Sequence, residues 1–132
     1  MRKLILALLL ICLSAYGSVE YLTNGNFNSK ISKGIVVVEY WAEWNNANKF
    51  KELNQLKDCT VYRACIAKCS DAASEYGIKA IPTVIIYDNG EEIKRFSPNI
   101  MLQLEASGKD VQSAIDEIVL NKFRYRYLSR CY

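Results

Sequence analysis

Cysteines are the residues of this 132-residue chain best suited to covalent chemistry. There are five, and Cys65 and Cys69 are separated by three residues, a spacing at which two thiols in a loop can reach disulfide geometry. The chain has no histidine, so no imidazole can activate a thiol and no histidine-containing metal site can form. Thiol–disulfide exchange by Cys65 and Cys69 is therefore one function that the sequence allows.

A structural role for the same pair is favoured, as a disulfide or as two free thiols. Neither cysteine opens a predicted helix, where a helix N-terminus would stabilise a thiolate. A zinc site of four thiolates is not expected, because Cys59 lies at the opposite end of the predicted strand from Cys65, and Cys131 lies in the tail. The sequence predicts no metal and no cofactor.

Residues 1–17 have the pattern of a secretory signal peptide. Arg2 and Lys3 precede ten apolar residues, and 15–17 (AYG) place small residues where a signal peptidase cleaves. Ten apolar residues are about half of what a membrane-spanning helix needs, so no stable membrane span is predicted. We expect a secreted or periplasmic protein that begins near Ser18 and keeps four cysteines, an even number that permits disulfides.

Composition and hydropathy predict one α/β domain over residues 18–121. Without Arg2 and Lys3 the chain has 15 basic and 14 acidic residues (17 − 2 = 15), too balanced for a nucleic-acid binder. The patterns predict a three-layer sandwich, in which helices flank a central mixed sheet. Strands are expected at 35–41, 61–66, 82–87 and 91–96, and helices at 23–32, 45–57, 71–76 and 107–120.

Three ordered motifs resemble the thioredoxin family. Residues 36–44 (VVVEYWAEW) are similar to the strand that enters the family's active site, and 76–83 (YGIKAIPT) to the segment around its cis-proline. Residues 88–91 (DNGE) are similar to its hairpin turn. The resemblance implies the thioredoxin fold, a cis Ile81–Pro82 peptide bond, and a peptide-docking edge formed by Trp44, Ile81 and Pro82. The alternative for Pro82 is that it only ends the sheet.

The chain departs from the family where the redox chemistry should be. Thioredoxins have Cys-x-x-Cys after the tryptophan, but Trp44 is followed by Asn45-Asn46-Ala47-Asn48. Because an amide is no nucleophile and cannot cycle between dithiol and disulfide, the resemblance implies a redox-inactive member. We expect Asn45 to cap the N-terminus of the following helix. A direct contact of Asn46 or Asn48 with a partner is the alternative.

Two further residues have family counterparts. The resemblance places Glu39 at the family's buried acid and Arg63 at its basic neighbour. In redox-active members the acid helps to deprotonate the second cysteine. Because this chain has no thiol there to serve, we interpret Glu39 and Arg63 as a residual structural pair whose burial should raise the pKa of Glu39.

The C-terminal segment 122–132 (KFRYRYLSRCY) lies beyond the family pattern. It has four basic residues, whereas 18–121 has 11 basic and 14 acidic residues and a net charge of −3. Alternating arginine and tyrosine predict a solvent-facing strand, or an arm that docks on an acidic or aromatic partner. Packing against its own domain, tied by Cys131, is the alternative.

The sequence as a whole predicts a redox-inactive binding or structural module with a protein partner. One alternative is an oxidoreductase that uses Cys65 and Cys69. Another is a subunit built into a larger assembly through its tail.

Overall fold

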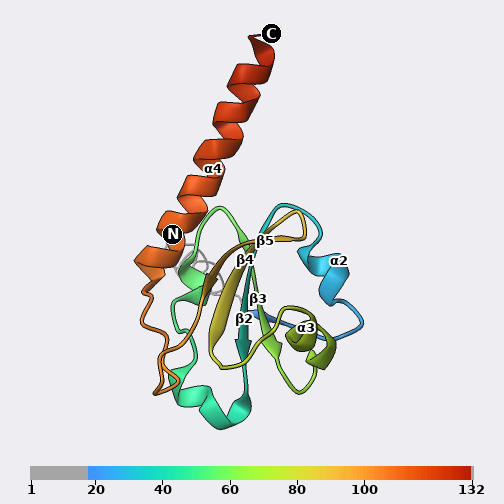
Figure 1. Ribbon diagram of the computed structural model, residues 1–132, viewed down its shortest axis with the longest axis vertical. Coiled ribbons are helices and arrows are strands. Elements are labelled where there is room, and N and C mark those ends of the chain that lie inside the picture. Colours follow the sequence, from blue (N-terminus) through green and yellow to red (C-terminus); the bar gives the residue numbers. More distant parts are fainter. Residues whose placement is uncertain (1–17, 132) are drawn as a thin grey trace, which may run out of the picture.

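The computed structural model describes residues 18–131, so the predicted signal peptide lies outside the described residues. Figure 1 shows a central sheet with helices on both sides and a long C-terminal helix. In chain order the elements are β1 Glu20–Leu22, α2 Phe27–Ile31, β2 Ile35–Trp41, the 3₁₀ helices η1 Glu43–Asn48 and η2 Leu53–Gln55, β3 Thr60–Cys65, α3 Ser70–Glu75, β4 Thr83–Asp88, β5 Glu91–Phe96 and α4 Gly108–Arg130.

The five strands form one mixed sheet in the order β1-β3-β2-β4-β5. β1 and β2 pair with β3 in parallel, while β4 runs antiparallel to both β2 and β5. β2 is at the centre and its five inner residues are buried, which explains its unbroken apolar and aromatic run. The turn at Asn89 and Gly90 has positive φ at both residues, as a two-residue hairpin turn requires. The predicted α/β fold is confirmed.

Each face of the sheet has its own apolar core. Val36, Val38 and Tyr40 of β2 pack on the side covered by α2 and α3. Val37 packs on the other side with residues of η2 and α4, among them Leu53 and Val111. This alternation along β2 creates the predicted three layers and places Glu39 on the same side as Val37 and α4.

The helix predicted over 45–57 does not form. This stretch contains only the short 3₁₀ segments η1 and η2, and Lys49 between them is extended, with φ −57° and ψ 142°. The backbone of Phe50 is bonded elsewhere: its N–H donates to Glu39 Oε2 at 2.5 Å, and its carbonyl accepts from Arg63 Nη2 at 3.2 Å. Because both groups serve the Glu39–Arg63 pair, they cannot take part in helical hydrogen bonding.

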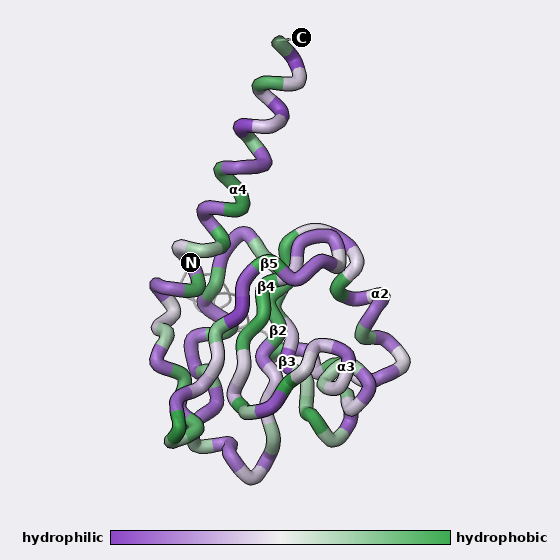
Figure 2. Tube along the Cα trace, viewed as in Figure 1, coloured by the Kyte–Doolittle hydropathy of each residue, from purple (hydrophilic) through white to green (hydrophobic). Residues whose placement is uncertain are grey.

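The strand predicted at 122–132 is also wrong, because residues 122–130 are the last turns of α4, whereas an arm that docks on a partner stays a prediction. No glycine or proline interrupts the sequence after Gly108, and basic and long apolar residues are good helix formers. Lys122 anchors the helix with a 2.5 Å bond from Nζ to Asp88 Oδ1 at the end of β4. Beyond this anchor α4 extends away from the sheet with apolar and polar residues interleaved (Figure 2).

Two contacts fix the start of α4. Ser107 Oγ accepts from the Asp110 N–H at 3.3 Å, and Asp110 Oδ2 accepts from the Ser107 N–H at 2.7 Å, which completes a capping box. Glu52 Oε2 accepts a third N–H, from Gly108, at 2.8 Å. Within residues 18–131, no helix is both long enough and apolar enough to cross a membrane.

Candidate functional site

The candidate site lies at the carboxyl end of β2, where three connections meet. η1 follows β2 directly, Ile81 and Pro82 precede β4, and the loop 97–106 follows β5. The Ile81–Pro82 peptide bond is cis, as the motif predicts. In Figure 1 these connections gather at the lower end of the sheet, opposite the free end of α4.

Asn45, at the position of the family's first cysteine, ties these connections together. Its Nδ2 donates to the carbonyl of Ile81 and to the carbonyl of Leu102, each at 3.1 Å. Its Oδ1 accepts from Asn48 Nδ2 at 2.8 Å. The two asparagines that replace the cysteines therefore contact each other, and all the hydrogen-bonding groups of the Asn45 amide have partners.

The capping role predicted for Asn45 is wrong. The residue that caps η1 is Ala42, and Asn45 is inside η1 with non-helical angles of φ −115° and ψ 29°. Its backbone N–H donates to the Ala42 carbonyl at 3.0 Å, while its side chain turns away from the segment's own backbone. The Asn45 side-chain oxygen, which would accept a backbone N–H in a cap, accepts from Asn48 Nδ2 instead.

Trp44 stands beside this cluster and is 68% exposed. With Ile66, Ile78, Ile81 and Leu102 it lines a groove of about 390 Å³. Of the predicted peptide-docking residues, Trp44 is exposed at the groove, Ile81 lines it but is only 3% exposed, and Pro82 is buried and is not among the lining residues. Ile66, Ile78 and Leu102 were not predicted as site residues. The signal for the last was an apolar run in a polar loop, at 100–102 (IML). The carbonyl of Ile81 is already in use by Asn45, so the apolar walls are the free part of the predicted edge.

Glu39 and Arg63 form the predicted pair in the buried interior. Arg63 Nε donates to Glu39 Oε1 at 2.6 Å, and the carboxyl group is fully buried. Burial raises the pKa of Glu39 above its usual value, while the bonds from Phe50 and Arg63 limit the rise. Both carboxyl oxygens and the arginine are used to position the chain around Phe50, so the pair has a structural role.

The four described cysteines are free thiols in this structure, so Cys65 and Cys69 do not form the disulfide that was one of the alternatives. Cys69 is buried and its Sγ donates to the carbonyl of Leu22 at 3.0 Å. Burial raises the pKa of the Cys69 thiol, and Cys65 beside it adds to the rise. A raised pKa lowers the thiolate fraction, which disfavours nucleophilic attack. Across residues 18–131, no three side chains of the metal-ligating types lie close enough to hold a metal ion.

Comparison with known proteins agrees with this fold and these motifs. Residues 18–107 match the thioredoxin family, and the chain belongs to that family. Thioredoxin-1 of Schizosaccharomyces pombe is 33% identical over 81 residues, which are 57% of this chain and 79% of that protein. Thioredoxin of Chlamydia caviae is 30% identical over 83 residues, 58% of this chain and 81% of that protein.

A solved structure gives the same result for the fold. The crystal structure of Malassezia sympodialis thioredoxin superposes with a TM-score of 0.58 at 24% identity, and the match covers 76% of this chain and 90% of that one. The family match stops at residue 107, directly before α4 begins at Gly108.

Proposed function

We propose that this thioredoxin-family chain binds an extended, apolar segment of a partner protein in the groove beside Trp44, without thiol–disulfide exchange. The observation that carries the proposal is the combination of an exposed tryptophan and apolar walls with an amide at the catalytic position. Concave, mostly apolar surfaces with a few polar groups are the usual form of binding sites. Nearby Ile100 is fully exposed and Met101 is 69% exposed, which extends the apolar surface past the groove.

The hydrogen bonds of the Asn45 amide support the same proposal, because they order the groove. Its bonds to Ile81 and Leu102 hold two walls of the groove at a fixed separation. A groove that is already ordered loses little conformational entropy on binding, which favours affinity. The state of Cys69 supports the absence of exchange, because this thiol is buried and donates to the carbonyl of Leu22, whereas Cys65 is only partly buried.

A displayed library of random dodecapeptides tests the binding function. We expect enrichment of peptides with two or more apolar residues in an extended stretch, and loss of their binding in Trp44→Ala and Ile78→Glu. Tyr125→Ala removes a similarly exposed aromatic ring far from the groove and is the matched control. Enriched peptides that bind Trp44→Ala as well as the unaltered chain would refute the groove as the binding site.

A disulfide-reduction assay tests the absence of exchange. Reduction of insulin by dithiothreitol should proceed at the same rate with and without the protein. Acceleration that disappears in Cys65→Ser or Cys69→Ser would instead establish the oxidoreductase alternative.

Export is part of the proposal. Its support is the charged start, the apolar run and the small residues of 1–17. N-terminal sequencing of the protein from its native host should find Ser18 or a neighbouring residue first. A chain that still begins at Met1 would refute export by cleavage.

A further inference from the structure

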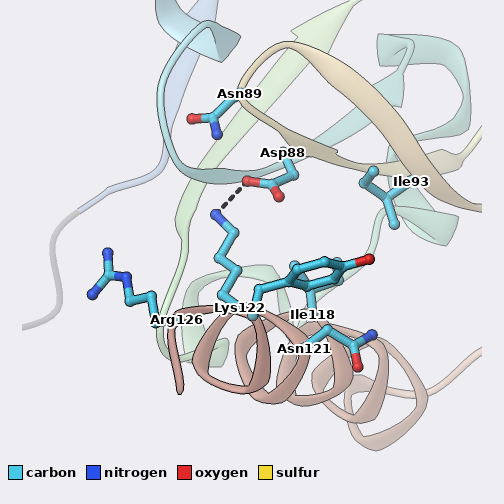
Figure 3. A pocket seen from close by; sticks show the side chains of 8 residues that line it. Asp88, Asn89, Ile93, Ile118, Asn121, Lys122 and Arg126 are labelled. Carbon is cyan, nitrogen blue, oxygen red and sulfur yellow. Dashed lines mark hydrogen bonds and ion pairs between the residues drawn. The ribbon is translucent and has the colours of Figure 1, made fainter. Parts of the chain in front are cut away.

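The outward face of α4 is apolar at its centre and lacks a partner. Val111, Ile115 and Lys122 mark the face that points to the body, since the first two are buried and Lys122 bonds to Asp88. Figure 3 shows Lys122 reaching from the helix to Asp88 below the hairpin. At 100° per residue, Leu120, Phe123 and Tyr127 form a stripe about 130° away from that face. Their side chains are 64%, 64% and 72% exposed.

Charge along this face changes sign from one end to the other. Asp116 and Glu117 are exposed before the stripe, and no acidic residue follows Glu117 in the chain. The second half has exposed Arg124 and Arg130 beside the stripe, while Arg126 lies toward the face that carries Lys122. In the first turn, exposed Lys109 and Asp110 offset each other in charge. A helix face that is acidic at one end and basic at the other is complementary to itself when turned end for end.

We propose that two copies of this chain associate through α4, with the two helices antiparallel and their outward stripes in contact. Antiparallel pairing places the apolar residues of both copies together at the centre. It also places the acidic end of each helix beside the basic end of the other. This association goes beyond the binding groove, which lies at the other end of the sheet and stays open.

A definite register follows from the spacing of the stripe. Placing Leu120 of one copy opposite Phe123 of the second copy brings Glu117 beside Arg124 of the second copy. The two-fold axis repeats both contacts, so two ion pairs flank a core of four apolar side chains. The helices overlap from about residue 112 to 131, roughly 30 Å at 1.5 Å per residue. Because each body lies about 130° around α4 from the stripe, it does not cover the surface that the second helix would occupy.

Two other arrangements fit the surface less well. A parallel pair would gather the arginines of both copies at one end, where like charges repel. An anionic lipid surface would attract the basic half, but it would repel Asp116 and Glu117 at the start of the same face. Only the antiparallel second copy uses both ends of the helix.

Charge exchange tests the proposal directly. Sedimentation of the full chain should show a reversible dimer at micromolar concentrations. Glu117→Arg and Arg124→Glu should each raise the dissociation constant at least tenfold, because both symmetric ion pairs become like-charge contacts. The double variant restores opposite charges and should return the constant to within about threefold of that of the unaltered chain. Lys51→Glu is the control for a charge reversal at an exposed site outside α4. Residues 1–17 are identical in every variant and cannot cause a difference.

Thiol cross-linking and vesicles separate the other arrangements. In the antiparallel pair the two Cys131 thiols are about 30 Å apart along the axis, so mild oxidation should not link them. Efficient Cys131–Cys131 linkage would indicate the parallel pair and overturn the proposal. A chain that stays monomeric at 200 μM, or a double variant that is no better than the single ones, would also overturn it. So would Arg124-dependent binding to phosphatidylglycerol vesicles by a monomeric chain.

Discussion

Removal of the Asn45 side chain should destabilise the protein, although this residue does not cap a helix. Asn45→Ala deletes two hydrogen bonds to the carbonyls of Ile81 and Leu102 and one from Asn48. At about 1 kcal/mol net for each bond, with a discount because water reaches the partly exposed site, the free energy of unfolding should fall by about 2 kcal/mol. For a chain of this size that corresponds to a Tm about 8 °C lower.

The neighbouring asparagine provides a matched control. Asn46 is exposed, lies in the same 3₁₀ segment, and its side chain makes none of the hydrogen bonds that hold the site. Asn46→Ala should therefore change the free energy of unfolding by less than about 0.5 kcal/mol. Urea unfolding of both variants at pH 7 measures the difference. If Asn45→Ala and Asn46→Ala unfold at the same urea concentration, the three bonds do not hold the site together.

Asn45→Asp separates bonding from packing. The carboxylate keeps the size of the side chain and can still accept from Asn48. It cannot donate to Ile81 or Leu102, and at pH 7 it places negative charge against two carbonyl oxygens. We expect a larger loss than in Asn45→Ala at pH 7, and partial recovery below about pH 4, where the protonated acid can donate one bond. Equal stability of Asn45→Asp and the unaltered chain at pH 7 would contradict the role of the donated bonds.

Three other predictions concern groups away from Asn45. Because the pKa of Glu39 is raised in the folded state, the stability of the unaltered chain relative to Glu39→Gln should be greatest below about pH 4 and should decline as pH rises through the folded pKa. Urea unfolding from pH 3 to 8 measures this stability difference, and a difference that grows with pH would contradict the prediction. The free energy of unfolding of Gly108→Ala should be about 1 kcal/mol lower in the same assay, despite the higher helix propensity of alanine, because a Cβ would lie 2.0 Å from Glu52 Oε2 and displace that cap. A gain in stability would show that the cap contributes nothing. Iodoacetamide should modify exposed Cys131 quickly at pH 8 and Cys59 slowly, since burial raises the pKa of Cys59 to about 11. Mass spectrometry of the two cysteine-containing peptides measures the order of modification, which would be reversed if Cys59 were accessible.

The strands were predictable because each carries its own signal. The run 35–41 is apolar on both faces, and β2 spans those same residues because its neighbours cover both faces. β1 was missed because it has only three residues, two of them exposed, and so has neither length nor alternation. β1 is a strand because it pairs with β3, and its own residues do not indicate that pairing.

The failures at the site have long-range causes. Phe50, Leu53 and Leu56 do have helical spacing, but the helix is lost because Glu39 and Arg63, on the neighbouring strands β2 and β3, bind the backbone groups of Phe50. The contacts of Asn45 reach 36 and 57 residues along the chain. Propensity predicted only a helix-capping role for Asn45, which is wrong, because the partners of its side chain depend on the tertiary fold.

The prediction for the end of α4 was wrong for a different reason. Alternating arginine and tyrosine satisfies the strand pattern as well as the helical one, and short segments of that kind are ambiguous. The long helix preceding them decides the outcome, because extending an existing helix avoids the cost of nucleating one.

The broken helix after Trp44 has a consequence for how the family chemistry was lost. A cysteine at a helix N-terminus is acidic because aligned peptide dipoles stabilise its thiolate. In this chain, one short 3₁₀ segment with a kink at residue 45 and an extended Lys49 replaces the ordered turns that would supply that field. Replacing the two asparagines by cysteines would therefore return the sulfur atoms without the electrostatic environment that ionises one of them. The backbone therefore differs from a working exchange site as well as the side chains, and we expect that two substitutions alone would restore little exchange activity.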